Sequence, residues 1–338
     1  MCSNSATRLP PASGLTAKGS AVQLCTELGR SSFTVLLCCL LGMLVVWGTA
    51  EAQQVTASSA TPVNLTTRPV SPSGSQLGSY YHQLEARLVS EGNLRQDRRP
   101  RGVRFSADDL ASNFMQIAMR SEYSLRGGSI SSGGQASPLR RWVQPVRLGV
   151  RFGASVDAGQ QRADLATIRQ VAHRLETASG HAVALTANSP NFHVLIVSDA
   201  ERSGLGPLLR QLVPGISRAA VNAVTGMGRN TFCMAVAVPN RDQSQGYDQA
   251  IAIVRAEHPP LMRQSCIEEE LAQGMGLAND SPRVRPSIFN DDEEFGVLTR
   301  HDELLLQMLY HPSLQPGMAP YQVERLLPAI ARQVAARG

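Results

Sequence analysis

The sequence is poor in lysine and in aromatic residues. Lys18 is its only lysine, and aromatic residues make up 5% of the 338 positions. Without lysine, the chain after residue 18 cannot form a Schiff base or a P-loop phosphate site. The net charge of +5 is modest, and the arginine-rich stretch 95–104 contains no aromatic residue to stack on a base. These absences argue against a nucleic-acid-binding protein.

Cysteine is also scarce in most of the chain. Cys233 and Cys266 are the only cysteines beyond the apolar segment 33–50. Two thiols in an oxidising compartment suggest one disulfide, whereas two buried free thiols are the alternative. The choice depends on whether the chain leaves the cytoplasm.

The N-terminal segment indicates the compartment. Residues 33–50, FTVLLCCLLGMLVVWGTA, carry no charge and precede an Ala-Glu-Ala sequence of the kind that signal peptidases cut after. We interpret residues 1–52 as a signal peptide or, if residues 31–50 stay uncleaved, as an N-terminal membrane anchor. Basic residues outnumber acidic ones in the preceding flank. The positive-inside rule therefore predicts an exported chain, either periplasmic or anchored and facing the periplasm.

Composition divides the remainder of the chain in two. Residues 53–78 are rich in Ser, Thr, Pro and Gly, which predicts disorder. A short helix is expected at 80–90, and the arginine-rich linker 95–104 follows it. We therefore expect a tether over residues 53–104 and a globular domain over residues 105–338.

Hydrophobic periodicity predicts the elements of the globular domain. Ser106 and Asp109 form a capping-box pattern ahead of helical spacing, and the Gly- and Ser-rich stretch 126–134 indicates a flexible loop. An amphipathic helix is expected at 163–175. Apolar runs predict strands at 143–153, 181–187, 191–199, 231–239 and 249–257. This order predicts an α/β (α+β) sandwich on one mixed sheet, with a further helix after the last strand.

That further helix contains CIEEELAQGMGLAND, residues 266–280, which has the outline of a zinc-protease helix without its histidines. The metzincin signature H-E-x-x-H-x-x-G-x-x-H brings three histidines to one Zn²⁺. Here the histidine places hold Glu269, Gln273 and Asn279. Glu270 stands where the general base would be, and Asp280 follows the third place.

A second stretch extends this resemblance. PSIFNDDEEFGVLTRHDELLLQMLYHP, residues 286–312, resembles the Ser-Ile-Met turn and the L-x-x-x-D-x-x-x-L-x-x-L-Y helix that follow the ligands in metzincins of the matrixin kind. Both stretches are also similar to those of domain-of-unknown-function family 2927, a bacterial family, over about residues 105–320. The resemblance implies that the replaced ligands belong to the family, and it brings no established activity.

The metzincin resemblance implies a disulfide and a cluster of side chains below the sheet. In that arrangement the sheet edge lies beside the helix, so we expect a bridge between Cys233 and Cys266. Glu269, Gln273 and Asn279 are expected to converge, either as a structural polar network or as a weak Ca²⁺ or Mg²⁺ site. Zinc is disfavoured because two of the three replacements offer only neutral amide oxygens, and no other cofactor is expected.

Three functions follow from these expectations. The first is a catalytically silent pseudo-protease whose cleft binds a peptide or an envelope component through Glu269, Gln273, Asn279 and Asp280. The second is a metal-dependent peptidase or hydrolase with nonstandard ligands, in which Glu270 activates water as a general base. A purely structural role tied to the membrane is a third. The missing histidines favour the first.

Overall fold

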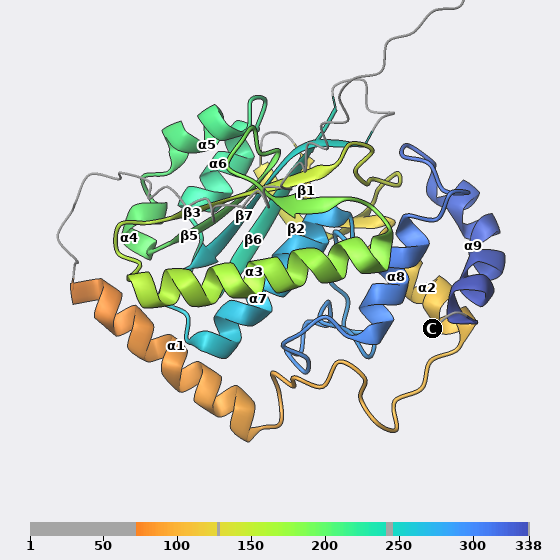
Figure 1. Cartoon of the computed structure of the whole chain (residues 1–338), viewed down its shortest axis with the longest axis horizontal. Helices are drawn as coiled ribbons and strands as arrows, with labels where there is room; N and C mark the ends of the chain where they lie inside the picture. The colour runs from red at the N-terminus through yellow and green to blue at the C-terminus, as the bar shows by residue number, and fades with distance from the viewer. Residues whose placement is uncertain (1–71, 127–128, 241–245, 337–338) are drawn as a thin grey trace, which may run out of the picture. The chain divides into compact units, whose positions relative to one another are not determined.

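The computed structural model of the chain describes residues 72–126, 129–240 and 246–336 (Figure 1). The expected signal peptide or anchor and residues 53–71 of the expected tether lie outside the described residues. Within the described part, none of the helices has the length and apolar character needed to cross a bilayer.

A five-stranded mixed sheet forms the centre of the fold. Its strands lie in the order β4-β3-β5-β7-β6, and all neighbours are parallel except β6, which runs antiparallel to β7. The strands are β3 (Val146–Phe152), β4 (Val183–Leu185), β5 (Phe192–Val197), β6 (Cys233–Pro239) and β7 (Tyr247–Arg255). Each of the five expected strands is therefore confirmed, and so is the α/β sandwich class.

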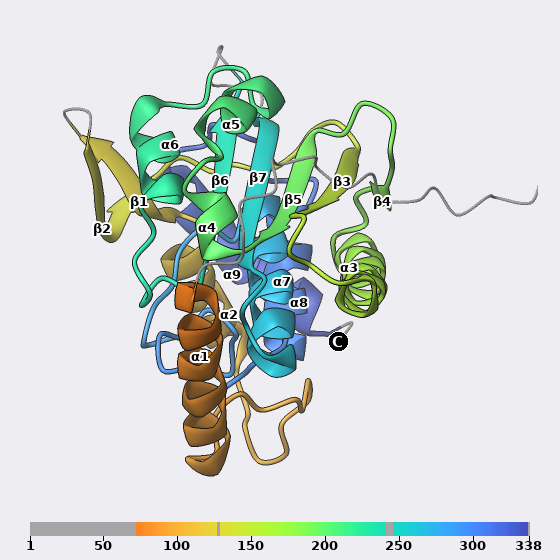
Figure 2. The ribbon, with the colours of Figure 1, turned by 90° about the vertical axis from the view of Figure 1, so that its left-hand side faces the viewer.

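Helices cover both faces of this sheet. Phe192, Val194 and Ile196 of β5 point into one core with α3 (Ala158–Ser179) and α7 (Pro260–Met275). Leu195 and Val197 point into a second core on the opposite face (Figure 2). This alternation is the normal pleat of a strand that is buried on both faces.

The second core is covered by helices that periodicity did not predict. They are α4 (Asp199–Arg202), α5 (Gly206–Leu212) and α6 (Arg218–Thr225). Ser198 and Ser217 cap the first and the last of them by accepting backbone N–H bonds. The helices are too short for a periodic pattern to stand out from a loop.

Residue 126 and residues 129–134 lie in strands, so the expectation of a flexible loop is wrong for these described residues. β1 (Arg120–Arg126) and β2 (Ser129–Ala136) pair as an antiparallel hairpin. Backbone hydrogen bonds between strands can form whatever the side chains are, so a segment rich in serine and glycine can still pair. The capping box of Ser106 and Asp109 is confirmed at the start of α2 (Ala107–Ile117).

Two helices near the C-terminus complete the structure. α8 (Arg300–Leu309) packs against α3, and α9 (Pro320–Ala335) packs against α2. Both α8 and α9 lie beside α2, at one end of the sheet (Figure 1). The apolar faces of these helices belong to the same core as α3 and α7.

The first helix, α1 (Pro72–Ser90), is longer than the expected helix at 80–90 and packs on the body. Tyr81 is fully buried, and its hydroxyl donates to the Arg229 carbonyl oxygen at 2.9 Å. The Glu85 carboxylate accepts the Met262 backbone N–H at 2.9 Å and so caps the start of α7. The expectation that residues 105–338 form the globular domain without this helix stays a prediction.

Candidate functional site

Helix α7 lies directly against the sheet. Gly274 is in contact with the Phe192 ring, and any side chain at position 274 would overlap that ring. The Trp142 indole N–H donates to the Gly274 carbonyl oxygen at 2.7 Å. The helix ends at Gly276, whose φ of 120° suits glycine. These contacts fix which way each residue of α7 faces.

A disulfide joins α7 to the edge strand β6. Cys233 at the start of β6 and Cys266 in α7 are bonded, with their Cα atoms 5.8 Å apart. The expected bridge is therefore confirmed, and the alternative of two free thiols is wrong. The bond holds the helix against the end of the sheet.

Glu269 and Glu270 of α7 lie beside this disulfide, and the carboxylates of Glu122 on β1 and Asp280 after the helix are near enough to act on them electrostatically. We call these four carboxylates the carboxylate cluster. Ligand atoms of Glu269, Glu270 and Cys233 all lie within 4.8 Å of one another. The Glu270 side chain is buried at 3% exposure, and its Oε2 atom has no hydrogen-bond partner.

The cluster strongly favours protonated carboxyl groups. Burial, followed by repulsion from Asp280 and Glu270, raises the pKa of Glu269 well above its usual range. Burial and then Glu122 raise the pKa of Glu270. The pKa of Asp280 is raised by burial and then by Glu122, although a hydrogen bond from Gln273 opposes this shift. Like charges that share a buried site cannot all ionise without a partner.

The side-chain amides of Gln273 and Asn279 donate to different partners. The Gln273 Nε2 atom donates to the two Asp280 carboxylate oxygens at 3.1 and 3.4 Å. The Asn279 Nδ2 atom donates instead to the backbone oxygens of Gln116 and Asp280, at 2.9 and 2.7 Å. The structure thus brings Glu269 and Gln273 to Asp280, and it ties the side chain of Asn279 to the backbone.

Two further acidic residues act on the cluster from the loop that follows. The pKa of Glu293 is raised to about 7 by burial and then by Asp291. Glu293 in turn raises the pKa of Glu269 and of Asp280. The sequence signal for this loop was the acidic run at 290–294, whereas nothing in the pattern pointed to Glu122.

The Ser-Ile-Phe turn has a structural role. Asp302 of α8 is fully buried and accepts hydrogen bonds from the Ser287 hydroxyl at 2.5 Å and the Ile288 N–H at 3.1 Å. It also accepts the Thr299 N–H at 2.8 Å and the Thr299 hydroxyl at 2.9 Å. One carboxylate therefore joins the turn to the start of α8.

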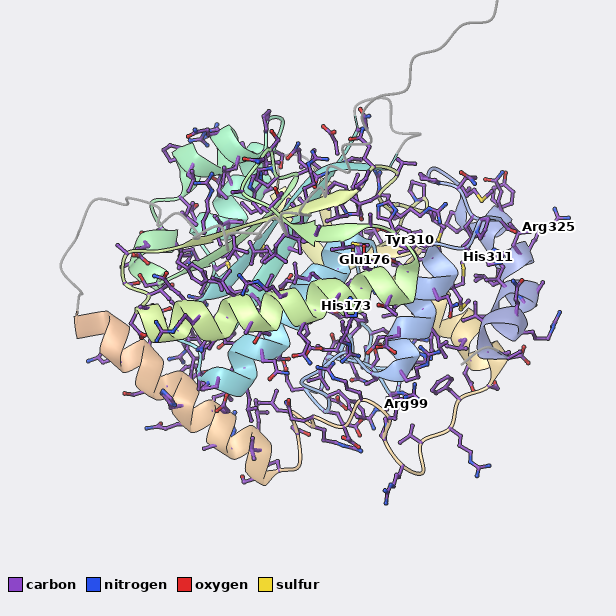
Figure 3. The ribbon with its side chains drawn as sticks, in the orientation of Figure 1. Arg99, His173, Glu176, Tyr310, His311 and Arg325 are labelled. Atoms are coloured by element: carbon purple, nitrogen blue, oxygen red, sulfur yellow. A yellow bond between two sulfur atoms is a disulfide. The ribbon has the colours of Figure 1, made fainter. Side chains whose placement is uncertain are left out.

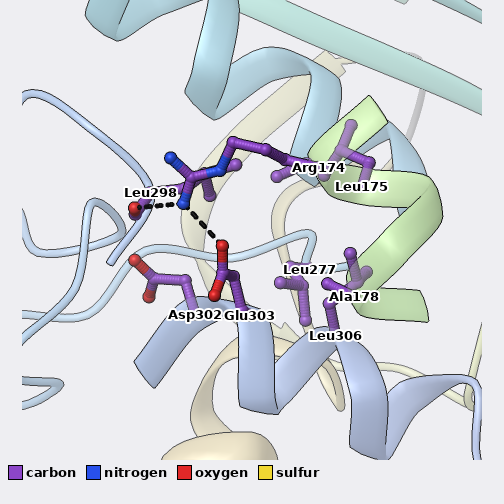
Figure 4. Close-up of a pocket in the computed structure, with 9 residues that line it drawn as sticks. Arg174, Leu175, Ala178, Leu277, Leu298, Asp302, Glu303 and Leu306 are labelled. Carbon is purple, nitrogen blue, oxygen red and sulfur yellow. Dashed lines mark hydrogen bonds and ion pairs between the residues drawn. The ribbon is translucent and has the colours of Figure 1, made fainter. Parts of the chain in front are cut away.

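The opposite side of α7 faces a small cavity between α3 and α8 (Figure 4). Arg174 crosses it and donates to the Leu298 carbonyl oxygen at 3.0 Å and to Glu303 at 2.6 Å. The cavity measures about 10 Å³, which leaves room for about one water and no larger ligand. A shallower groove of about 320 Å³ lies beside it, lined by His173, Arg174, Thr177, Ala178, Arg300, Glu303 and Gln307.

The histidines do not assemble a metal site in the described part of the chain. His173 lies on α3 and His311 beyond the end of α8, well separated in Figure 3. His258 is buried beside Tyr81, with their ring centroids 4.5 Å apart. The only potential metal-binding group found among the described residues consists of Cys233, Glu269 and Glu270, and it contains no histidine.

The fold and the site define a three-layer α/β domain with a carboxylate cluster, fully buried only at Glu270, beside the edge strand of its sheet. A family model described as a protein of unknown function (DUF2927) matches residues 107–329. The chain belongs to this family. Neither a curated protein nor a solved structure matches the chain.

Proposed function

We propose that the chain is an exported, metzincin-like pseudo-protease that binds an extended peptide of the cell envelope without cleaving it. The observation that carries this proposal is the outer edge of β6. Strand β6 is the last strand of the sheet, and no further strand of the described residues pairs with its outer edge. Its sequence, CMAVAVP, is apolar, and residues 235–239 are only half-buried.

An unpaired apolar edge strand is a template for another strand. A peptide that adds to it gains backbone hydrogen bonds along its length, and its alternate side chains can enter neighbouring pockets. The strand begins at Cys233, beside the carboxylate cluster. A peptide bound there would pass the position where the metzincin resemblance puts the reacting site.

The chemistry at that position argues against peptide cleavage. The places of the three histidines hold Glu269, Gln273 and Asn279, which supply no ring nitrogen for zinc. A general base must be ionised, and the raised pKa of Glu270 disfavours the ionised form of this carboxyl group. Three features support the proposed likeness to metzincins. They are the element order, the chain turn at Gly276 and the hydrogen bond from the Ser287 hydroxyl to Asp302.

The alternative function, a metal-dependent hydrolase with Glu270 as general base, is favoured by one observation. The Glu270 Oε2 atom is buried without a hydrogen-bond partner. A cation in the cluster would favour the ionised form of Glu270, which a base requires. Peptide binding and peptide cleavage are therefore to be measured on the same ligand.

The test begins with a display library of random peptides screened against the purified full chain. We expect selected peptides to carry apolar residues at alternate positions, and we expect mass spectrometry to find them intact after incubation. Single prolines at Val236 and Ala237 then test the edge, because adjacent residues of a strand direct their N–H groups to opposite sides. One of the two variants should keep the fold and lose about tenfold or more in affinity.

The exposed position Tyr321 on α9 gives a control, and Tyr321→Ala should bind as the parent does. Failure to select any peptide, or equal binding by both proline variants, would overturn the peptide proposal. Cleavage of the selected peptide that is lost in Glu270→Gln would establish the hydrolase instead.

A further inference from the structure

Glu269, Glu270 and Asp280 of the carboxylate cluster differ from the buried carboxylates Glu268 and Asp164, each of which has a positive partner. Glu268, at 1% exposure, pairs with Arg98 at 2.7 Å, and Asp164, at 3% exposure, pairs with Arg263 at 2.7 Å. No ion pair reaches Glu269, Glu270 or Asp280 in the part of the chain that the structure describes. Buried charges are normally paired or bound to a metal.

A second observation comes from Glu270 itself. This side chain is 3% exposed, and Oε2 has no hydrogen-bond partner although it lies among polar groups. Its carboxylate is directed to Glu269 and the Cys233 sulfur, within 4.8 Å. A buried oxygen that lacks any donor costs free energy unless a ligand supplies one. The orphan atom therefore points to a ligand between the two glutamates.

We propose that Glu269 and Glu270, whose ligand atoms lie within 4.8 Å of each other, bind one hard divalent cation, Ca²⁺ or Mg²⁺, with Asp280 beside them. Their oxygens are the ligands that these ions prefer, and Glu122 adds a further negative charge from β1. The Cys233 sulfur is held in the disulfide and is not a thiolate, so the soft ligand that zinc favours is absent from the group.

Gln273 is a positioning residue for this site. Its amide donates to both oxygens of Asp280 and so orients that carboxylate toward α7. The cation would join α7 to the segment after it and to the β1 hairpin, whose Glu122 N–H already bonds the Ala278 carbonyl oxygen at 3.0 Å. The site goes beyond the proposed peptide function, and either of the two can hold without the other.

Thermal unfolding of the chelator-treated full chain tests the site. Millimolar CaCl₂ or MgCl₂ should raise the melting temperature of the parent, because a ligand that binds only the folded state stabilises it by mass action. Glu270→Gln should abolish this rise. It should also melt above the parent in chelator, because glutamine replaces a buried carboxyl group that has no positive partner, and below the parent in saturating cation.

The melting-temperature difference between variant and parent thus changes sign between chelator and saturating cation. This change distinguishes a cation ligand from a structural residue, whose loss would lower the melting temperature in both conditions. Glu324→Gln, at an exposed position of α9, makes the same chemical change away from the cluster and should behave as the parent. A parent indifferent to both ions would overturn the proposal. So would a Glu270→Gln variant that responds as the parent does, or stabilisation by zinc alone.

A second measurement does not depend on any variant. Crystals of the parent soaked in Mn²⁺, which accepts the same oxygen ligands, should give an anomalous peak between Glu269, Glu270 and Asp280. A soaked crystal without this peak would contradict the site. Cation binding and peptide selection are measured in separate experiments. A negative result for the cation therefore leaves the peptide result unaffected, and a negative result for the peptide leaves the cation result unaffected.

Discussion

At the scale of single residues, three consecutive glutamates of α7 have two kinds of surroundings, because the helix turns Glu268 away from the side that Glu269 and Glu270 share. Glu268 faces the N-terminal segment, where both of its oxygens accept bonds from the Arg98 guanidinium at 2.7 Å. Glu269 and Glu270 face the disulfide and Asp280. Successive helix residues are about 100° apart, so a structural ion pair and a ligand site can be neighbours in sequence.

A buried histidine gives a pH prediction at this scale. His193 of β5 is 4% exposed, and burial followed by the charge of Arg151 lowers its pKa from 6.5 to about 4. The unfolded chain therefore binds a proton at a higher pH than the folded chain does. Stability should fall as pH drops from about 6.5 to about 4, by roughly 3 kcal/mol from this residue.

Denaturant unfolding of the parent and of His193→Gln across this pH range checks the prediction. The difference between the two free-energy curves isolates His193 from His258, whose pKa is also lowered, to about 3. The variant should show the shallower loss toward acid. Parallel curves for the two proteins would contradict this assignment.

At the scale of elements, the disulfide is the covalent link between β6 and α7. Cys233 and Cys266 are 33 residues apart, and closing a loop of this size stabilises the folded state by roughly 3 to 4 kcal/mol on the chain-entropy model. We expect Cys233→Ala with Cys266→Ala to lose about this amount in urea unfolding. Reduction of the parent should give a similar loss, and equal stability of all three forms would show that the bond adds nothing.

The elements that the sequence predicted are those whose pattern depends on local spacing. Apolar runs identified the five strands, and the capping pattern of Ser106 identified α2. The short helices α4, α5 and α6 have 4, 7 and 8 residues, so their spacing gives little signal. The hairpin of β1 and β2 was missed because its stability comes from pairing and not from composition.

The same division applies to the candidate site. The motif located Glu269, Gln273 and Asp280, which lie within a few residues of one another. Glu122 lies far away along the chain and reaches the cluster only through tertiary structure. Sequence spacing also does not predict hydrogen-bond partners. The Gln273 amide donates to Asp280, whereas the Asn279 amide donates to the Gln116 carbonyl oxygen.

At the scale of the whole molecule, the packed structure begins well before the family match. The match starts at residue 107, whereas α1 begins at Pro72 and is followed by a segment that pairs with the body. The Leu94 N–H bonds the Glu293 carbonyl oxygen at 2.8 Å, and Arg98 pairs with Glu268. The N-terminal segment is therefore part of the folded unit.

A chain that begins at residue 105 should consequently be unstable. It would leave Glu268 as a buried charge without its arginine, which costs about 3 to 5 kcal/mol, and would remove the Glu85 cap of α7. A chain that begins at residue 72 is the control. Thermal unfolding of the two should give a clearly lower midpoint for the shorter one, and equal midpoints would mean that residues 72–104 only rest on the surface.

The contacts of α1 also determine how the domain would respond to mechanical force. A pull on the N-terminal side of α1 reaches the body first through Tyr81 and Glu85, which hold the Arg229 carbonyl oxygen and the Met262 N–H. One helical turn beyond Met262, the disulfide at Cys266 ties α7 to the sheet. The load therefore passes through α1 into α7 and the cross-linked sheet before it reaches Leu94, whose N–H bonds the Glu293 carbonyl oxygen in the acidic loop at 290–294.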